Sequence, residues 1–206
     1  MKEIDRPYNL FYEEGLSYYK SGVILQNSPD RIQEEDLLFR PIVYLLRHAL
    51  ELLFKALIVK DVVTKNKGSW NTMKFPPENR RLNTIHSIKT LYETWKLMCN
   101  NVTNNDEEGI DEIENIVEQL DSYDFSSTFF RYPYSKEGEV NRKRLTEEVD
   151  EDILTSVPCS LGAFIYHEGP EKFACLHREQ MMDCLEEDLV NVIEYLIAYY
   201  KTIDKD

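Results

Sequence analysis

Apolar side chains recur every three or four residues along several stretches of this chain, which is the spacing of an amphipathic α-helix. The pattern predicts such helices at residues 8–23, 85–95, 110–120 and 180–200. Asn83 or Thr84 can cap the second of these helices. Each segment also keeps polar positions, so we expect these helices to surround a common core.

One further segment is too apolar for a helix with a broad solvent face. It begins between Asp36 and Pro41 and ends near Val63, and residues 42–58 are almost entirely apolar. Pro41 suits the first turn of a helix, where its missing N–H would have no partner in any case. We therefore expect a central helix with neighbours on most sides.

Two stretches lack helical periodicity. Residues 64–83 are polar and contain the pair Pro76 and Pro77, which predicts a loop. Residues 123–175 are rich in aromatic residues and predict an extended or irregular insertion, with a short hairpin or a brief helix at 142–152 as further options. The fold class predicted for the chain is therefore all-α, with this insertion before its last helix.

Charge is distributed unevenly along the chain, whose formal net charge is −14. Residues 40–96 contain eleven Lys or Arg and four Asp or Glu, whereas residues 97–206 contain nine basic and 26 acidic residues. The overall charge argues against a general nucleic-acid binder. The basic and acidic parts can complement each other within the fold or across a dimer, or the basic part can form a surface that meets phosphates.

The composition also limits the location of the chain and its cofactors. No stretch of about 18 apolar residues lacks charges, so we expect no membrane span. The first residues include acids and no apolar signal-peptide core, which favours a cytoplasmic location. No two of the four cysteines form a CxxC pair, so we expect reduced thiols, no metal and no cofactor.

A narrow charged stripe runs along the apolar central segment. Arg47, Glu51 and Lys55 are four residues apart and share one helix face, with His48 beside them. Alternating charges at this spacing favour pairing along the helix. Because an unpaired buried charge is costly, the stripe either forms a structural network or solvated strip, or lines a functional cleft or dimer seam.

The same segment carries a family resemblance. Residues 41–58, PIVYLLRHALELLFKALI, look like the signature helix of HEPN-like domains. Residues 86–91, HSIKTL, resemble the helix start that commonly follows it, and residues 124–133, ending in Phe-Arg-Tyr-Pro, resemble a segment of a bacterial branch. The resemblance implies a single HEPN-like domain over residues 1–206, folded as an antiparallel helical bundle and often forming a homodimer.

Many HEPN-like proteins are metal-independent endoribonucleases of toxin–antitoxin or anti-phage defence systems, and others bind RNA or nucleotides without activity. Active members carry an arginine, four to six further residues and then a histidine, usually on a late helix. Arg80 and Arg81 stand at such spacings before His86, which makes the three the candidate catalytic residues. They lie at the start of the third helix, however, and the last helix contains no arginine or histidine.

These observations support three hypotheses. The first is a regulatory module that binds RNA or a nucleotide. The second is an endoribonuclease that uses Arg80 or Arg81 together with His86, and the third is a module that binds only a partner protein. The residues expected to meet a ligand or phosphate are Arg47, His48, Glu51, Lys55 and Arg131. Arg131 can alternatively bond a carboxylate such as Glu51 and fix the aromatic segment to the central helix.

Overall fold

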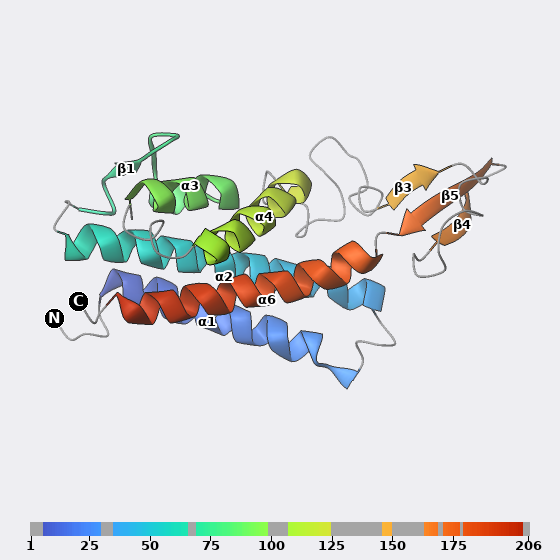
Figure 1. Ribbon diagram of the computed structural model, residues 1–206, viewed down its shortest axis with the longest axis horizontal. Helices are drawn as coiled ribbons and strands as arrows, with labels where there is room; N and C mark the ends of the chain where they lie inside the picture. Colours follow the sequence, from blue (N-terminus) through green and yellow to red (C-terminus); the bar gives the residue numbers. More distant parts are fainter. Residues whose placement is uncertain are drawn as a thin grey trace.

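The computed structural model describes residues 6–29, 35–65, 69–98, 107–124, 146–149, 163–168, 171–177 and 179–203. Within them the chain is mostly helical, which confirms the predicted all-α class (Figure 1). The helices are α1 (Pro7–Gln26), α2 (Glu35–Thr64), α3 (Ile88–Met98), α4 (Glu107–Asp124) and α6 (Glu179–Thr202).

Helix α2 forms the centre of the bundle, as its apolar sequence predicts. Every residue from 49 through 62 is buried, because α1, α3 and α6 pack around this part of the helix. Fully burying one of its leucine, isoleucine or valine side chains contributes about 1.5–3 kcal/mol. The position of α2 therefore sets the positions of its neighbours.

The expectation that Pro41 occupies the first turn of this helix is wrong. Helix α2 begins at Glu35, so Pro41 lies inside it, and its exposed ring removes one backbone hydrogen bond. The side chains of Phe39 and Ile42, on either side of the proline, are buried in the core. Burial of these flanking residues offsets the lost backbone hydrogen bond, so the helix extends from Pro41 back to Glu35.

The contacts between helices define their directions. Helix α1 runs antiparallel to α2, since Gly15 lies against Ala49 and Gly22 against Leu46. Helices α3 and α4 are also antiparallel, since Lys89 approaches Asp121 whereas Lys96, later in α3, contacts Glu114, earlier in α4. In contrast, α3 runs parallel to α2, since His86 just before α3 contacts Glu51 and Trp95 further along contacts Phe54. Helix α6 also runs parallel to α2, since Tyr200 near its end contacts Lys60 near the end of α2 (Figure 1).

This return passes through two short strands, β1 (Lys74–Phe75) and β2 (Arg80–Arg81), and a 3-10 helix at Leu82–Thr84. The region predicted as a loop thus contains a small hairpin. Helix α3 begins later than expected, and neither Asn83 nor Thr84 caps it. Ser87 does so instead, because its Oγ accepts a hydrogen bond from the Thr90 backbone N–H at 3.2 Å.

The region between α4 and α6 contains three strands, β3 (Thr146–Val149), β4 (Ala163–Glu168) and β5 (Glu171–His177). They form an antiparallel sheet in the order β3-β5-β4, so the short hairpin considered for this region is present. The brief helix considered for 142–152 is wrong at 146–149, where the backbone pairs with β5. The remainder of the 123–175 prediction lies outside the described residues.

None of the helices within the described residues combines the length and the apolar composition needed to cross a bilayer.

Two glycines of α1 allow it to approach α2 closely, and they provide a test of this packing. A Cβ added to Gly22 would lie 2.8 Å from Leu46 Cδ2, whereas one added to Gly15 would lie 3.3 Å from its nearest neighbour, Leu53 Cγ. Because Leu46 is fully buried, we expect Gly22→Ala to lower the free energy of unfolding by about 1–2 kcal/mol despite its better helix propensity. Urea denaturation measures this change.

Gly15→Ala is the matched control. Its looser fit predicts a change within about 0.5 kcal/mol, because the gain in helix propensity balances a small shift of the neighbours. A Gly22→Ala protein as stable as the Gly15→Ala protein would contradict the close approach of α1 and α2.

Candidate functional site

The charged stripe of α2 converges on the carboxylate of Glu51. Lys55 Nζ donates a hydrogen bond to Glu51 Oε1 at 2.7 Å, and Arg47 Nη1 donates to Oε2 at 3.3 Å. The His86 ring joins from outside the helix, with its Nδ1 3.0 Å from Oε1. His48 Nδ1 lies 3.8 Å from Oε2, which is beyond a hydrogen bond. We call these five residues the Glu51 cluster.

Two different elements bring the Glu51 cluster together. The i,i+4 spacing of α2 places Arg47 and Lys55 one turn on either side of Glu51, as the sequence predicts. His86 reaches them because Leu82 and Ile85, just before it, are buried in the core. Arg47 also fixes this segment directly, since its Nη2 donates a hydrogen bond to the His86 carbonyl oxygen at 2.6 Å.

The electrostatics of the cluster keep Glu51 ionised. Burial by itself would raise the pKa of this carboxyl, but the nearby His48, Lys55 and Arg47 lower the pKa to well below its usual range. Lys55 and Arg47 provide the firmer contacts because they lie within or close to hydrogen-bond distance. An ionised carboxylate only accepts hydrogen bonds, so the His86 Nδ1 that faces it carries a hydrogen.

The side chains of the Glu51 cluster differ in their exposure to solvent. Arg47, Glu51 and Lys55 are at most 4% exposed, whereas 53% of the His86 side-chain surface is exposed. A ligand can therefore touch His86, while the three charged α2 residues lie beneath it. In this arrangement the α2 residues hold His86 in place, and only His86 combines a fixed position with broad access to solvent.

His48 occupies an aromatic environment at the edge of the cluster. Its ring makes an edge contact with Tyr18 of α1, at 4.4 Å between centroids, and lies parallel to the Tyr44 ring at 6.0 Å. Only 18% of its side-chain surface is exposed. His48 thus links α1 to α2 and is much less accessible than His86.

The two arginines predicted as partners of His86 lie apart from the Glu51 cluster. Arg80 pairs with Glu78 at 3.1 Å and donates to the Thr84 carbonyl oxygen at 2.5 Å. Arg81 is exposed on the short strand β2. No side-chain contact joins either arginine to the Glu51 cluster in the described part of the chain, and Arg131 lies outside that part.

Sequence reasoning treated His86 and the α2 stripe as separate candidates, and it missed their contact. A local signal for it exists, since the apolar residues Leu82 and Ile85 anchor the segment before His86 in the core. Sequence reasoning also missed Lys60, which is fully buried. Its Nζ donates to the Tyr200 carbonyl oxygen at 2.8 Å and lies 4.0 Å from the Tyr200 ring centroid, so it ties α2 to the end of α6.

The chemistry available at the Glu51 cluster is proton exchange and anion binding. Two permanent cations surround one carboxylate, so the five side chains carry a net positive charge even when both imidazoles are neutral. The described residues contain no group of three or more His, Cys, Asp or Glu side chains that could hold a metal ion.

The role of Glu51 as the counter-ion of the cluster can be tested by Glu51→Gln. The substitution removes the carboxylate that the buried Arg47 Nη1 and Lys55 Nζ contact, so we expect the free energy of unfolding at pH 7 to fall by about 3–5 kcal/mol. A matched triple variant, with Arg47→Met, Glu51→Leu and Lys55→Leu, removes all three charges. It should recover most of that loss in chemical denaturation, and a triple variant as unstable as Glu51→Gln would contradict the assignment.

The stabilising effect of the ionised Glu51 should also depend on pH in a predictable direction. The pKa of Glu51 is lowered in the folded state from an ordinary value of 4.5, so its stabilising effect is present above that value. The effect is lost as the pH falls below 4.5 toward the lowered pKa. The stability difference between wild type and Glu51→Gln should therefore be constant near neutral pH and shrink below about pH 4.5.

Neither a scan against protein-family models nor searches of curated proteins and solved structures found a match for this chain.

Proposed function

We propose that this chain is an HEPN-like regulatory module that binds RNA or a nucleotide, with His86 as the residue that meets a phosphate. The observation that carries the proposal is the double attachment of His86. Its ring is held by Glu51 and its backbone carbonyl by Arg47, while the side chain remains half exposed. A contact group fixed in advance loses little conformational freedom when a ligand binds.

The resemblance of α2 and of the segment that contains His86 to HEPN-like proteins adds support. The resemblance also suggests a homodimer, and a bacterial defence or toxin–antitoxin system with a cognate partner protein as the setting. Under this proposal Arg47, Glu51 and Lys55 position His86 rather than touch the ligand, because they are buried. The net positive charge of the Glu51 cluster favours an anionic ligand.

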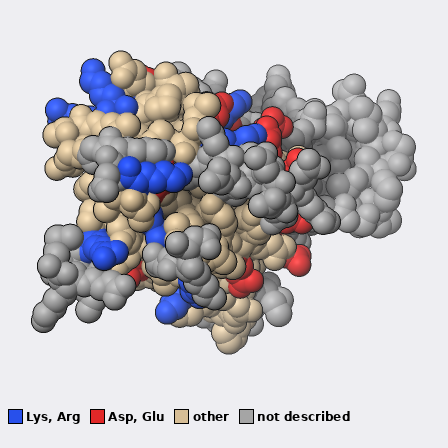
Figure 2. All heavy atoms as spheres, turned by 60° about the vertical axis from the view of Figure 1, so that its left-hand side comes forward, with Lys and Arg blue, Asp and Glu red and all other residues tan. Residues whose placement is uncertain are grey.

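The described residues on the face shown in Figure 2 fit a local contact better than a broad nucleic-acid footprint. Figure 2 shows Lys and Arg side chains in several separate groups at the end of the bundle that lies on the left in Figure 1. A general nucleic-acid binder would gather such side chains into a patch or stripe. We therefore expect binding that depends strongly on His86 and only moderately on salt concentration.

Isothermal titration with short single-stranded RNA and with a panel of nucleotides tests this function. His86→Gln removes the imidazole, so we expect it to weaken binding on the order of tenfold. Arg81→Gln is the matched control, since it removes a full charge from a nearby exposed residue outside the Glu51 cluster. Loss of binding in Arg81→Gln but not in His86→Gln would contradict the proposed site. If wild type binds no member of the panel, the protein-interaction hypothesis takes its place.

A second candidate function is a metal-independent endoribonuclease, and the Glu51–His86 contact favours it. With Nδ1 facing the ionised Glu51, a neutral His86 keeps Nε2 as its proton-accepting atom. It can take the proton of an RNA 2′-hydroxyl while that oxygen bonds to phosphorus and the bond from phosphorus to the 5′-oxygen breaks. The leaving 5′-oxygen takes its proton from water. The carboxylate would then stabilise the imidazolium that forms.

This activity predicts RNA cleavage in the presence of EDTA. His86→Gln should lower kcat/KM by about 100-fold or more, because the proton acceptor is lost. His167→Gln provides a histidine control outside the Glu51 cluster and should leave the rate unchanged. Cleavage that survives His86→Gln would rule out this site.

A further inference from the structure

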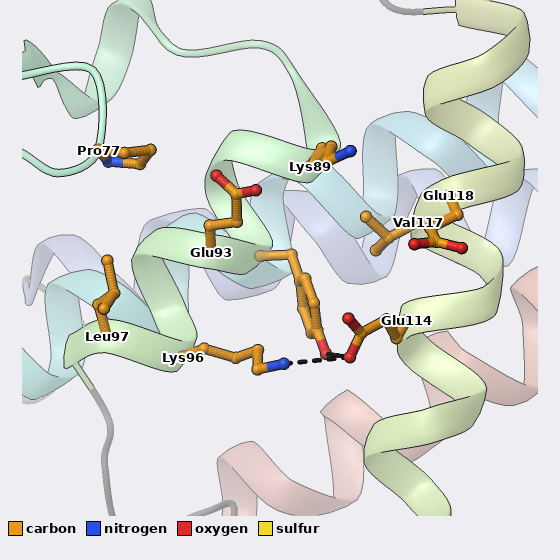
Figure 3. A pocket seen from close by; sticks show the side chains of 9 residues that line it. Pro77, Lys89, Glu93, Lys96, Leu97, Glu114, Val117 and Glu118 are labelled. Carbon is orange, nitrogen blue, oxygen red and sulfur yellow. Dashed lines mark hydrogen bonds and ion pairs between the residues drawn. The ribbon is translucent and has the colours of Figure 1, made fainter.

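A second surface feature lies away from the Glu51 cluster, between α3 and α4. It is a groove of about 370 Å³ whose floor contains the buried side chains of Tyr92 and Val117. Pro77 and Leu97 border it, and Leu97 is 56% exposed (Figure 3). The groove thus offers apolar contact area to another molecule.

The two lysines that line this groove already have acidic partners. Lys96 Nζ and the Tyr92 hydroxyl both donate to Glu114 Oε2 at 3.1 Å, so this lysine is already engaged (Figure 3). Lys89, on the rim, lies 3.9 Å from Asp121. The groove cations therefore already face carboxylates, and an anionic ligand would have to compete with them.

Two carboxylates of the groove remain available. Glu93 lies on the α3 side and Glu118 on the α4 side (Figure 3). Among the residues that the structure describes, neither makes a hydrogen bond or an ion pair with another side chain. Helix α4 adds to this imbalance, since its sequence, EEGIDEIENIVEQLDSYD, contains eight acidic residues and no lysine or arginine. The groove lining therefore carries more acidic than basic side chains, with Glu93, Glu114 and Glu118 against Lys89 and Lys96, and it has apolar surface to cover.

We infer that the α3–α4 groove docks a basic amphipathic segment of a partner protein. Apolar side chains of that segment cover Leu97, Tyr92 and Val117, and its lysine or arginine side chains pair with Glu93 and Glu118. Charge complementarity selects this occupant, because RNA or an acidic segment would be repelled by the same carboxylates. The inference is independent of the proposed function, which depends on His86 and the Glu51 cluster.

Fluorescence anisotropy with a labelled synthetic peptide tests this inference. The probe is an amphipathic helical peptide of leucine, lysine and alanine, used with the full chain at physiological ionic strength. The double variant Glu93→Gln/Glu118→Gln should weaken peptide binding roughly fivefold to tenfold, because two rim charges are lost. Leu97→Ser should have a similar effect through loss of apolar contact.

Matched controls separate docking in the groove from general attraction to an acidic protein. Glu13→Gln/Glu14→Gln removes two exposed acids of α1, and Leu10→Ser removes a side chain that is 57% exposed. Both controls should change the affinity less than about twofold. Equal weakening by the controls, or binding that the groove variants leave unchanged, overturns the inference.

Two altered peptides and a competition with short RNA test which features of the partner segment the groove recognises. A peptide with glutamate in place of lysine, or serine in place of leucine, should bind at least about tenfold more weakly. Equal binding of either peptide, or displacement of the peptide by short RNA, overturns the inference.

A change in oligomeric state of the groove variants, measured by light scattering, would instead assign the groove to a second copy of this chain. His86→Gln should leave peptide binding unchanged, so failure of the proposed function is distinguishable from failure of the groove.

Discussion

A carboxylate inside the most buried helix is the constraint on which the rest of the structure depends. Helix α2 is enclosed over residues 49–62, yet it carries Glu51 and Lys55 within that stretch and Arg47 just before it. Charges in such a position are stable only when they compensate one another. The i,i+4 contacts of Glu51 with Arg47 and Lys55 satisfy this condition within one helix face.

Buried charged side chains of α2 also bond to other segments of the chain, and these bonds help to define the packing of the helices. Arg47 donates to the carbonyl oxygen of His86 and Lys60 to that of Tyr200, so two buried cations of α2 each bond to the backbone of another segment. The first bond fixes the chain just before α3, and the second fixes the end of α6. Polar contacts of this kind are directional, whereas apolar packing alone permits small shifts and rotations of neighbouring helices.

The same arrangement separates two surfaces of opposite character. His86 projects from a cluster with net positive charge, while the groove between α3 and α4 is bordered by carboxylates and a largely exposed leucine. Because α3 begins two residues after His86, the anchoring of that segment by Arg47 also helps to place the groove. The two surfaces therefore depend on one structural centre but favour ligands of opposite charge.

The sequence by itself determined the elements that depend on local periodicity. The central position of α2 follows from its nearly continuous apolar residues, and the pairing of Arg47 and Lys55 with Glu51 follows from their spacing. The position of Pro41 inside α2, rather than in its first turn, could not be read locally, because burial of Phe39 and Ile42 outweighs the cost of the proline within the helix. Only the tertiary structure decided that His86, 35 residues after Glu51, would complete the cluster while Arg80 and Arg81 would not. The physical reason is that periodicity reports which face of a segment is buried, whereas the partner of a buried charge depends on how the intervening chain returns to it.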